Sequence, residues 1–289
     1  MKQLLILSGK GGTGKTTVAG AFIKLSKAKA FADCDVDAPN LHLIVEKKNI
    51  PVEKDFYGLP KAKINQEVCI SCGQCYKECR FEAIIKDELY EVDDFACEGC
   101  GVCEYVCPVN AIEMKDSVSG ELLLYKDKEV FSTATLKMGS GNSGLLVTEV
   151  KNQMRDNVED CEIGIIDGSP GIGCPVIASV TGVDMVLIVS EPSLSGLSDM
   201  ERIIRTVNGF GIKVVVCINK YDTNTELSES IIEYCNRNNI DYVGKIPYDS
   251  LAYTATNRGL SIIDVECEAG KAVKKVYEGT MKILNETEG

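Results

Sequence analysis

The chain has 289 residues, with 31 Lys and Arg against 43 Asp and Glu, so its formal net charge is −12. A surface this acidic argues against a general binder of nucleic acid or of anionic membranes, because its field repels both. The sequence has no run of 18 uncharged apolar residues and no basic-then-apolar leader, so we expect a cytoplasmic protein with no nucleic acid partner and no stable membrane insertion.

The first predicted element is a strand at Gln3–Leu7, followed by a glycine-rich loop and a helix from Lys15 to about Lys27. The loop fits the phosphate-binding pattern G-x-x-x-x-G-K-[ST] at the strand-to-helix position that the pattern needs. Glycines let backbone N–H groups converge on phosphate oxygens, Lys15 can reach the β- and γ-phosphates, and the Thr16 hydroxyl can bind Mg²⁺. The predicted nucleotide-binding residues are Gly9, Lys10, Gly11, Gly12, Thr13, Gly14, Lys15, Thr16 and Thr17.

Lys10 is a second lysine inside this loop. It resembles the signature lysine of the deviant Walker A motif, KGGTGKTT, found in the MinD/ParA/nitrogenase iron protein superfamily. The resemblance implies an ATPase that uses ATP and Mg²⁺ and forms a homodimer on binding ATP. In that dimer Lys10 would reach the phosphates of the partner subunit, so Lys10 and Lys15 would both be catalytic, Lys10 in the manner of an arginine finger.

The next segment, residues 33–40, follows a short predicted strand at Ala30–Ala32. It resembles the superfamily's switch I, in which an aspartate orients or activates the attacking water. The resemblance implies that Asp35 is the catalytic aspartate. Asp37 is the second choice for that role and a candidate Mg²⁺ ligand.

Residues 61–116 hold eight of the 14 cysteines and have 6 basic and 12 acidic side chains, which is half of the net negative charge. A shift of 28 positions aligns the segment starting at Cys69 with the segment starting at Cys97, and 7 of 16 positions are identical. One half-module is therefore duplicated. Thiols stay reduced in the cytosol, so these cysteines are not expected to form a disulfide framework.

Both repeats have the spacing C-x2-C-x2-C-x3-C, which is typical of bacterial two-cluster ferredoxins, where the fourth cysteine of each run binds the other cluster. This spacing predicts two [4Fe–4S] clusters. Four-cysteine zinc sites are the alternative, but zinc gives no reason for a third and a fourth cysteine in both runs. The predicted ligand sets are Cys69, Cys72, Cys75 and Cys107 for cluster one, and Cys97, Cys100, Cys103 and Cys79 for cluster two.

Beyond the cysteine region, an apolar strand at Ile163–Ile166 ends in Asp167, as a Walker B strand does, and Asp167 is expected to face Mg²⁺ with Thr16 and Asp37. The segment that follows, Gly168–Gly171, resembles switch II. Further strands are expected at Met185–Val189 and Val214–Ile218. The superfamily resemblance implies base contacts after the last of these strands and near the end of the chain, from Asn219, Lys220, Pro247 and Asp249.

Cys174 stands where the nitrogenase iron protein has one of the two cysteines that hold a cluster between its subunits. From Lys115 to Asp160 the chain has no cysteine to serve as the second, so we expect Cys174 to be a buried small apolar side chain.

Short apolar runs that alternate with helical segments predict an α/β fold, a doubly wound and mainly parallel sheet. The simplest organisation is an ATPase domain formed by residues 1–60 and 117–289, with residues 61–116 inserted in a surface loop as a small α+β, bacterial-ferredoxin-like domain. The remaining helices are expected at Gly144 to Asn157, Leu197 to Asn208, Leu227 to Asn238 and Ala269 to Leu284.

Over nearly its whole length the sequence resembles MinD-superfamily P-loop ATPases that contain an inserted ferredoxin domain. Three functions are compatible with this resemblance. The first is an ATPase that couples hydrolysis to electron transfer with a redox protein that docks on the acidic insert. The second is an ATPase that assembles or delivers iron–sulfur clusters, and the third is a MinD-like spatial organiser with structural clusters. The C-P-x-C motif of cluster-carrier ATPases is missing, and the C-terminal segment is a poor membrane-targeting helix.

Overall fold

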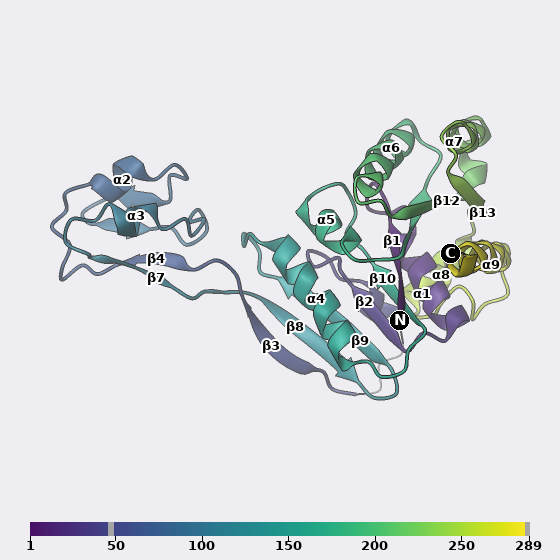
Figure 1. The fold of residues 1–289 in the computed structure, drawn as a ribbon, viewed down its shortest axis with the longest axis horizontal. Helices are drawn as coiled ribbons and strands as arrows, with labels where there is room; N and C mark the ends of the chain where they lie inside the picture. The colour runs from purple at the N-terminus through teal and green to yellow at the C-terminus, as the bar shows by residue number, and fades with distance from the viewer. Residues whose placement is uncertain (46–48, 287–289) are drawn as a thin grey trace.

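The computed structural model describes residues 1–45 and 49–286, which form a large α/β body and a small lobe (Figure 1). The described residues of the body build a nine-stranded sheet with the order β13-β12-β11-β1-β10-β2-β9-β8-β3. Its strands are β1 (Lys2–Leu7), β2 (Ala30–Asp33), β3 (Val52–Tyr57), β8 (Val118–Lys126), β9 (Val130–Leu136), β10 (Ile163–Asp167), β11 (Met185–Ser190), β12 (Lys213–Asn219) and β13 (Asp241–Ile246).

Helices cover both faces of this sheet. They are α1 (Lys15–Ser26), α4 (Ser143–Asn157), α5 (Cys174–Val180), α6 (Leu194–Asn208), α7 (Thr225–Arg237), α8 (Ser250–Asn257) and α9 (Glu268–Glu286), with short 3₁₀ turns η1 (Leu41–Leu43) and η2 (Tyr221–Thr223). One apolar core lies between the sheet and helices α1 and α9, and a second lies between the sheet and helices α4 to α7. None of the described helices is both long and apolar enough to cross a membrane.

The predicted doubly wound, mainly parallel sheet is confirmed. All strand pairs from β13 to β9 are parallel, and only β8 and β3, at one edge of the described sheet, are antiparallel to their neighbours. The central strands β1, β10 and β11 are continuous apolar runs that are buried on both faces, as a parallel sheet between two helical layers requires. Parallel strands end at the same edge, so the loops after β1, β2, β10, β11 and β12 converge there.

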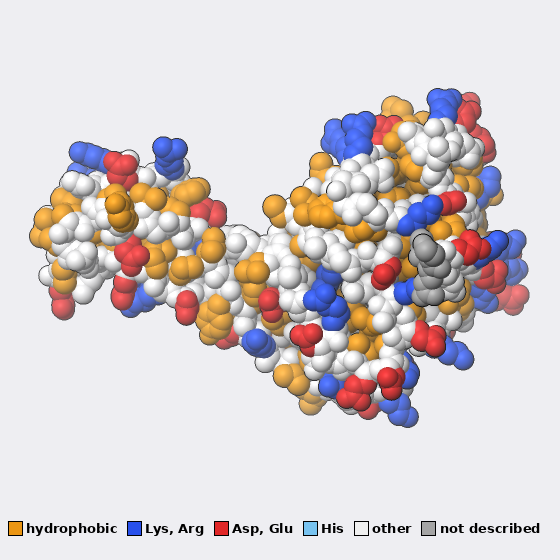
Figure 2. All heavy atoms as spheres, viewed as in Figure 1, with side chains coloured by type: hydrophobic (Ala, Val, Ile, Leu, Met, Phe, Trp, Pro, Cys, Tyr) orange, Lys and Arg blue, Asp and Glu red, His pale blue; other side chains and the backbone are white. Residues whose placement is uncertain are grey.

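The small lobe lies in the connection between the edge strand β3 and its antiparallel neighbour β8. Its elements are β4 (Lys61–Ile64), α2 (Gln74–Glu78), β5 (Ile84–Lys86), β6 (Tyr90–Val92), α3 (Val102–Tyr105) and β7 (Ile112–Lys115). Strand β4 pairs with β7, and β5 with β6, both antiparallel. The lobe has its own small core of Ala62, Ala83, Ile84, Tyr90 and Ile112 with Cys75 and Cys97. Figure 2 shows it as a separate body on a narrow neck.

Candidate functional site

The phosphate-binding loop joins β1 to α1 in the geometry that its sequence predicts. Gly12 and Gly14 have φ angles of +80° and +93°, which side chains other than glycine rarely adopt, and α1 begins directly at Lys15. The Lys15 ammonium lies 2.6 Å from Oδ1 of Asp167 at the end of β10, and both side chains are almost completely buried. The loop lysine and the Walker B aspartate are thus brought into direct contact.

The Lys15 ammonium stays charged inside the protein. Burial lowers the pKa of Lys15 most strongly, but the hydrogen-bonded carboxylate of Asp167 and the charges of Asp35 and Asp33 together outweigh burial and hold the pKa of the ammonium above its usual value. The second carboxylate oxygen of Asp167, Oδ2, is buried and accepts no hydrogen bond from any described residue. A buried oxygen without a donor is costly, so this atom fits a role as an acceptor for Mg²⁺ or its water ligands.

Asp33, which sequence reasoning did not select, is the organising residue of the switch I segment, residues 33–40. It is fully buried at the end of β2, directly beside Asp167 in the strand register. Its Oδ1 accepts a hydrogen bond from the N–H of Asp35 at 3.0 Å, and its Oδ2 accepts from the N–H groups of Asn40 and Leu41, both at 2.9 Å. Burial and the charge of Asp167 raise the pKa of Asp33 to about 7. The signal that could have identified Asp33 was an acidic residue at the end of a buried strand, next to the Walker B strand.

The other switch I acids surround this centre. Asp35 is half-buried, and burial raises its pKa above the usual value, although Lys15 opposes this. Asp37 is exposed, and Thr16 is half-buried in the first turn of α1. The charge of Asp35 is one of those that raise the pKa of Lys15, while Asp35 and Asp37 both remain predictions as catalytic and metal-binding residues.

Lys10 contacts its own chain. Its ammonium lies 2.5 Å from Oε1 of Glu191, and it donates hydrogen bonds to the hydroxyls of Ser193 at 3.2 Å and Ser195 at 3.1 Å. These residues follow β11, which neighbours β1 in the sheet. Sequence reasoning gave the loop after β11 no chemistry, although its position at the carboxyl edge next to the phosphate loop was a signal that it could have used.

Asn219 and Lys220, which were predicted to contact the base, donate hydrogen bonds to the backbone of the phosphate-binding loop. The Asn219 amide donates to the carbonyl of Thr13 at 2.6 Å, and the Lys220 ammonium donates to the carbonyl of Gly12 at 2.8 Å. The Lys220 ammonium also lies 3.7 Å from Oε2 of Glu191. Both residues line the pocket beside the loop, so a role toward a nucleotide stays compatible with these bonds.

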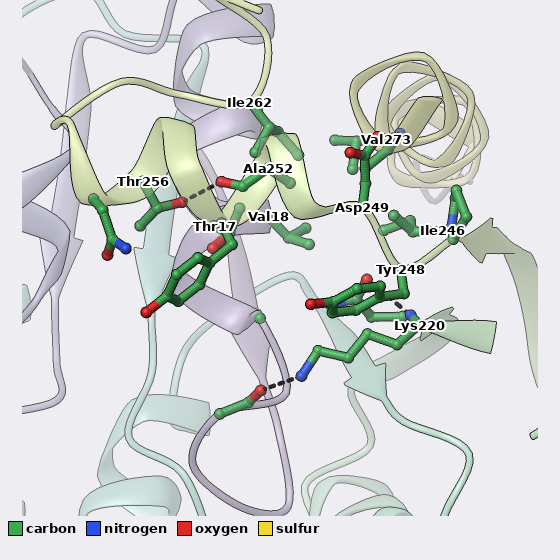
Figure 3. A pocket seen from close by; sticks show the side chains of 17 residues that line it. Thr17, Val18, Lys220, Ile246, Tyr248, Asp249, Ala252, Thr256, Ile262 and Val273 are labelled. Carbon is green, nitrogen blue, oxygen red and sulfur yellow. Dashed lines mark hydrogen bonds between the residues drawn. The ribbon is translucent and has the colours of Figure 1, made fainter. Parts of the chain in front are cut away.

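This pocket has a volume of about 250 Å³, just below the range of 300–1,000 Å³ that is typical of ligand sites. Figure 3 shows Thr17 and Val18 of α1 next to Ala252 and Thr256 of α8, with Tyr248 beside Lys220. Pro247 and Asp249 also line it, and Asp249 accepts hydrogen bonds from the N–H groups of Leu251 and Ala269 that fix the adjoining helices.

The sequence analysis did not predict that α8 and α9 form walls of this pocket. Helix α8 was not expected, and the apolar side chains that it and its neighbours bring to the pocket carry no motif. They include Tyr248, Ala252, Tyr253, Ile262 and Val273.

In the lobe, two hollows lie close to the cysteines. One is lined by Cys69, Cys72, Cys75 and Cys107, and the other by Cys79, Cys97, Cys100 and Cys103, each set together with apolar side chains. We call them the Cys69 hollow and the Cys97 hollow. Each has a volume of about 20 Å³, so the repeats form two small spaces of equal size. In each space three cysteines of one run meet the fourth cysteine of the other run.

Cys174 is exposed at the start of α5, so the expectation of a buried side chain was wrong. The glycine-rich segment Gly168–Gly173 leads the chain from the buried strand β10 to the surface. Cys174 follows this segment directly and is the first residue of α5. Among the described residues, Cys174 belongs to no group of three or more side chains that could hold a metal ion.

Comparison with known proteins gives a consistent result. Residues 4–262 match the model of the CobQ/CobB/MinD/ParA nucleotide-binding domain family. An uncharacterized protein of Methanocaldococcus jannaschii is 33% identical over 286 residues, covering 96% of this chain and 95% of its own length. The iron-sulfur cluster carrier protein of Pyrococcus abyssi is 24% identical, covering 99% of this chain and 88% of its own length.

Among solved structures, the cell division ATPase MinD of Pyrococcus furiosus superposes with a TM-score of 0.59 at 18% identity, covering 98% of this chain and 99% of its own. That likeness shows the fold of the body. The family match covers most of the chain and includes the phosphate-binding loop, switch I, the Walker B strand and β12. The chain therefore belongs to the CobQ/CobB/MinD/ParA family of nucleotide-binding domains.

Proposed function

We propose that the protein is an ATPase that dimerises on binding ATP and couples hydrolysis to electron transfer through two [4Fe–4S] clusters in residues 61–116. The observation that carries this proposal is the pair of cysteine-lined hollows on a lobe that is joined to a nucleotide-binding body. A family ATPase needs no such lobe to hydrolyse ATP, so the lobe requires a function of its own.

In the nucleotide site, residues of this chain would act as follows. The loop N–H groups and Lys15 bind the phosphates, and Thr16, Asp37 and Asp167 would hold Mg²⁺, which neutralises phosphate charge. Asp35 orients the water that attacks the γ-phosphorus, giving ADP and phosphate. Lys10 leaves Glu191 and reaches the phosphates of the second subunit, so hydrolysis depends on the dimer. The base occupies the pocket between α1, α8 and α9.

In the lobe, the four cysteine thiolates around each hollow would hold one cluster, which supplies one-electron transfer. Single zinc ions fit less well. A tetrahedral zinc with bonds of about 2.3 Å to sulfur needs sulfurs about 3.8 Å apart. Within the described residues, no three Cys, His, Asp or Glu side chains are grouped closely enough to hold one metal ion.

The acidic charge of the insert supports docking of a basic redox protein. The insert carries 12 acidic and 6 basic side chains, so a partner with a positive face would be steered to it. Among the described residues, exposed apolar side chains near the hollows, including Ile70 and Tyr105, offer a contact area inside that field.

Anaerobic purification followed by iron and acid-labile sulfide analysis tests the lobe, with about eight iron atoms per chain expected. ATP hydrolysis and the dimer fraction with a non-hydrolysable ATP analogue test the body, with Lys15→Ala as the inactive reference. Stoichiometric zinc in place of iron would overturn the cluster assignment. Hydrolysis by Lys15→Ala at the wild-type rate would overturn the nucleotide site.

Delivery of iron–sulfur clusters is the second candidate, favoured by relatives that are named iron-sulfur cluster carrier proteins. It requires labile clusters. Incubation of the loaded protein with an apo-ferredoxin separates the two candidates, because an electron carrier keeps its iron and a carrier of clusters transfers it. We expect the iron to stay, since each hollow is formed by cysteines from both runs.

A further inference from the structure

The lobe and the body meet at residues 137–142, which connect β9 to α4 and which we call the relay loop. The ring of Phe95 in the lobe lies over Gly139 so closely that a Cβ at Gly139 would be 2.8 Å from Cδ1 of the ring. A Cβ at Gly141 would lie 3.6 Å from Oε2 of Glu98. In Figure 1 the segment before α4 reaches toward the lobe. The glycines of the relay loop therefore permit direct contact with the lobe.

This contact is next to one hollow of the lobe. Phe95 and Glu98 flank Cys97, whose carbonyl accepts a hydrogen bond from Lys61 at the neck end of β4. The Cys69 hollow is lined instead by Ile64 and Ile112, the pair at the outer end of strands β4 and β7. The Cys97 hollow is thus the one beside the neck and the relay loop.

The relay loop is also tied to switch I. The N–H of Leu136, directly before the loop, donates to the carbonyl of Val36 at 2.9 Å. Switch I is in turn tied to switch II, Gly168–Gly171, because the Ser169 hydroxyl donates to the carbonyl of Cys34 at 2.6 Å. Any movement of switch I relative to the sheet therefore acts on the start of the relay loop.

The other end of the relay loop is tied to the helix that follows switch II. A Cβ at Gly144, in the first turn of α4, would lie 3.3 Å from the carbonyl oxygen of Cys174. Deeper in α4, the buried Lys151 ammonium donates to three carbonyls at the end of α5, those of Ala178 at 3.2 Å and of Ser179 and Thr181 at 2.6 Å. Helix α4 therefore contacts both ends of α5, and the two helices would move as one unit.

We propose that the relay loop is the joint through which the nucleotide state of both switches acts on the Cys97 hollow, and not on the Cys69 hollow. The inference rests on the proposed function, because it names the route by which ATP and the lobe are linked. The physical basis is a continuous chain of hydrogen bonds and close contacts. It runs from two segments that are expected to change with nucleotide to residues 93–101, which carry Cys97 and Cys100, and its last contact is made by Phe95, a side chain that is 75% exposed.

Hydrogen exchange of the cluster-loaded protein, with and without ATP and Mg²⁺, tests the route. In the wild type, exchange should change at least about fivefold in residues 33–40, 168–171 and 93–101, and by less than about twofold in residues 66–74. In Phe95→Ala the response of residues 93–101 should fall below about twofold, while both switches respond as before. Gly139→Ala disturbs the same contact from the body and should give the same loss.

Tyr105→Ala is the matched control, because Tyr105 is an exposed aromatic residue that precedes Cys107 by two positions, as Phe95 precedes Cys97. It should keep the wild-type response, and iron content should be equal in all variants. A full response of residues 93–101 in both Phe95→Ala and Gly139→Ala would overturn the route and leave the proposed function standing. No response of the switches in the wild type would overturn both.

Discussion

The contact between Lys10 and Glu191 opposes the dimer that the proposed mechanism needs. Lys10 must leave Glu191, Ser193 and Ser195 before it can reach a second subunit. Replacing Glu191 by Gln removes the charge and keeps the size of the side chain. We therefore expect Glu191→Gln to strengthen dimerisation in the presence of an ATP analogue.

The size of the effect follows from the exposure of the pair. The Lys10 side chain is 35% exposed and that of Glu191 19%, so solvent screens the attraction. Exposed ion pairs contribute about 0.2–1 kcal/mol, and the partly buried carboxylate places this pair at the upper end, about 1 kcal/mol. A dimer releases two such contacts, about 2 kcal/mol, which corresponds to a dimer dissociation constant about 30-fold lower.

Analytical ultracentrifugation over a range of protein concentrations, with a non-hydrolysable ATP analogue, measures this constant. Glu201→Gln is the control, because Glu201 is a surface carboxylate on α6 that pairs with Arg205. It should dimerise as the wild type does. An unchanged or weaker dimer in Glu191→Gln would refute the reasoning, as would a Lys10→Ala dimer that hydrolyses ATP normally.

Three further predictions concern the buried charges and the cysteines. Asp167→Asn leaves the buried Lys15 ammonium unpaired, so urea unfolding of the nucleotide-free protein should show a loss of about 3 kcal/mol and hydrolysis should fall at least about 100-fold; wild-type stability would contradict the ion pair. Burial lowers the pKa of Lys151 to about 8, so the unfolded chain binds more protons between pH 8 and its usual value of 10.5. The stability of the wild type relative to Lys151→Met should therefore rise by about 3 kcal/mol over that interval, and a constant difference would contradict the shift. Cys79→Ser should lose only the cluster of the Cys97 hollow, leaving about four iron atoms and exposing Cys97, Cys100 and Cys103 to alkylation; alkylation of the first run instead would contradict the crossed ligand sets.

Much of the body could be predicted because its signals are local. The strand, glycine loop and helix of residues 2–26 are adjacent in sequence, and an apolar run that ends in Asp167 needs no distant information. Strand β3 was missed because it is an edge strand with one buried residue, Phe56, among exposed polar ones. Such a strand is stabilised by its pairing with β8, and its own sequence does not show the hydrophobic pattern of a strand.

The rest of the site depends on contacts between distant segments. Glu191 becomes a partner of Lys10 only because β11 lies beside β1. Asp33 becomes the organiser of switch I only because β2 places it against Asp167, where burial and like charge act together. The cysteine spacing predicted two ligand sets, but the place of the Cys97 hollow at the neck and of Phe95 on Gly139 required the folded chain.

Linkage between the two sites is the central claim, and a single pair of titrations tests it directly. The midpoint potentials of the two clusters are measured anaerobically with and without a saturating non-hydrolysable ATP analogue. We predict that one potential shifts by about 40 mV or more, with a matching change of at least about fivefold in the affinity for the analogue between oxidised and reduced protein. Identical potentials and identical affinities in all states would contradict the account.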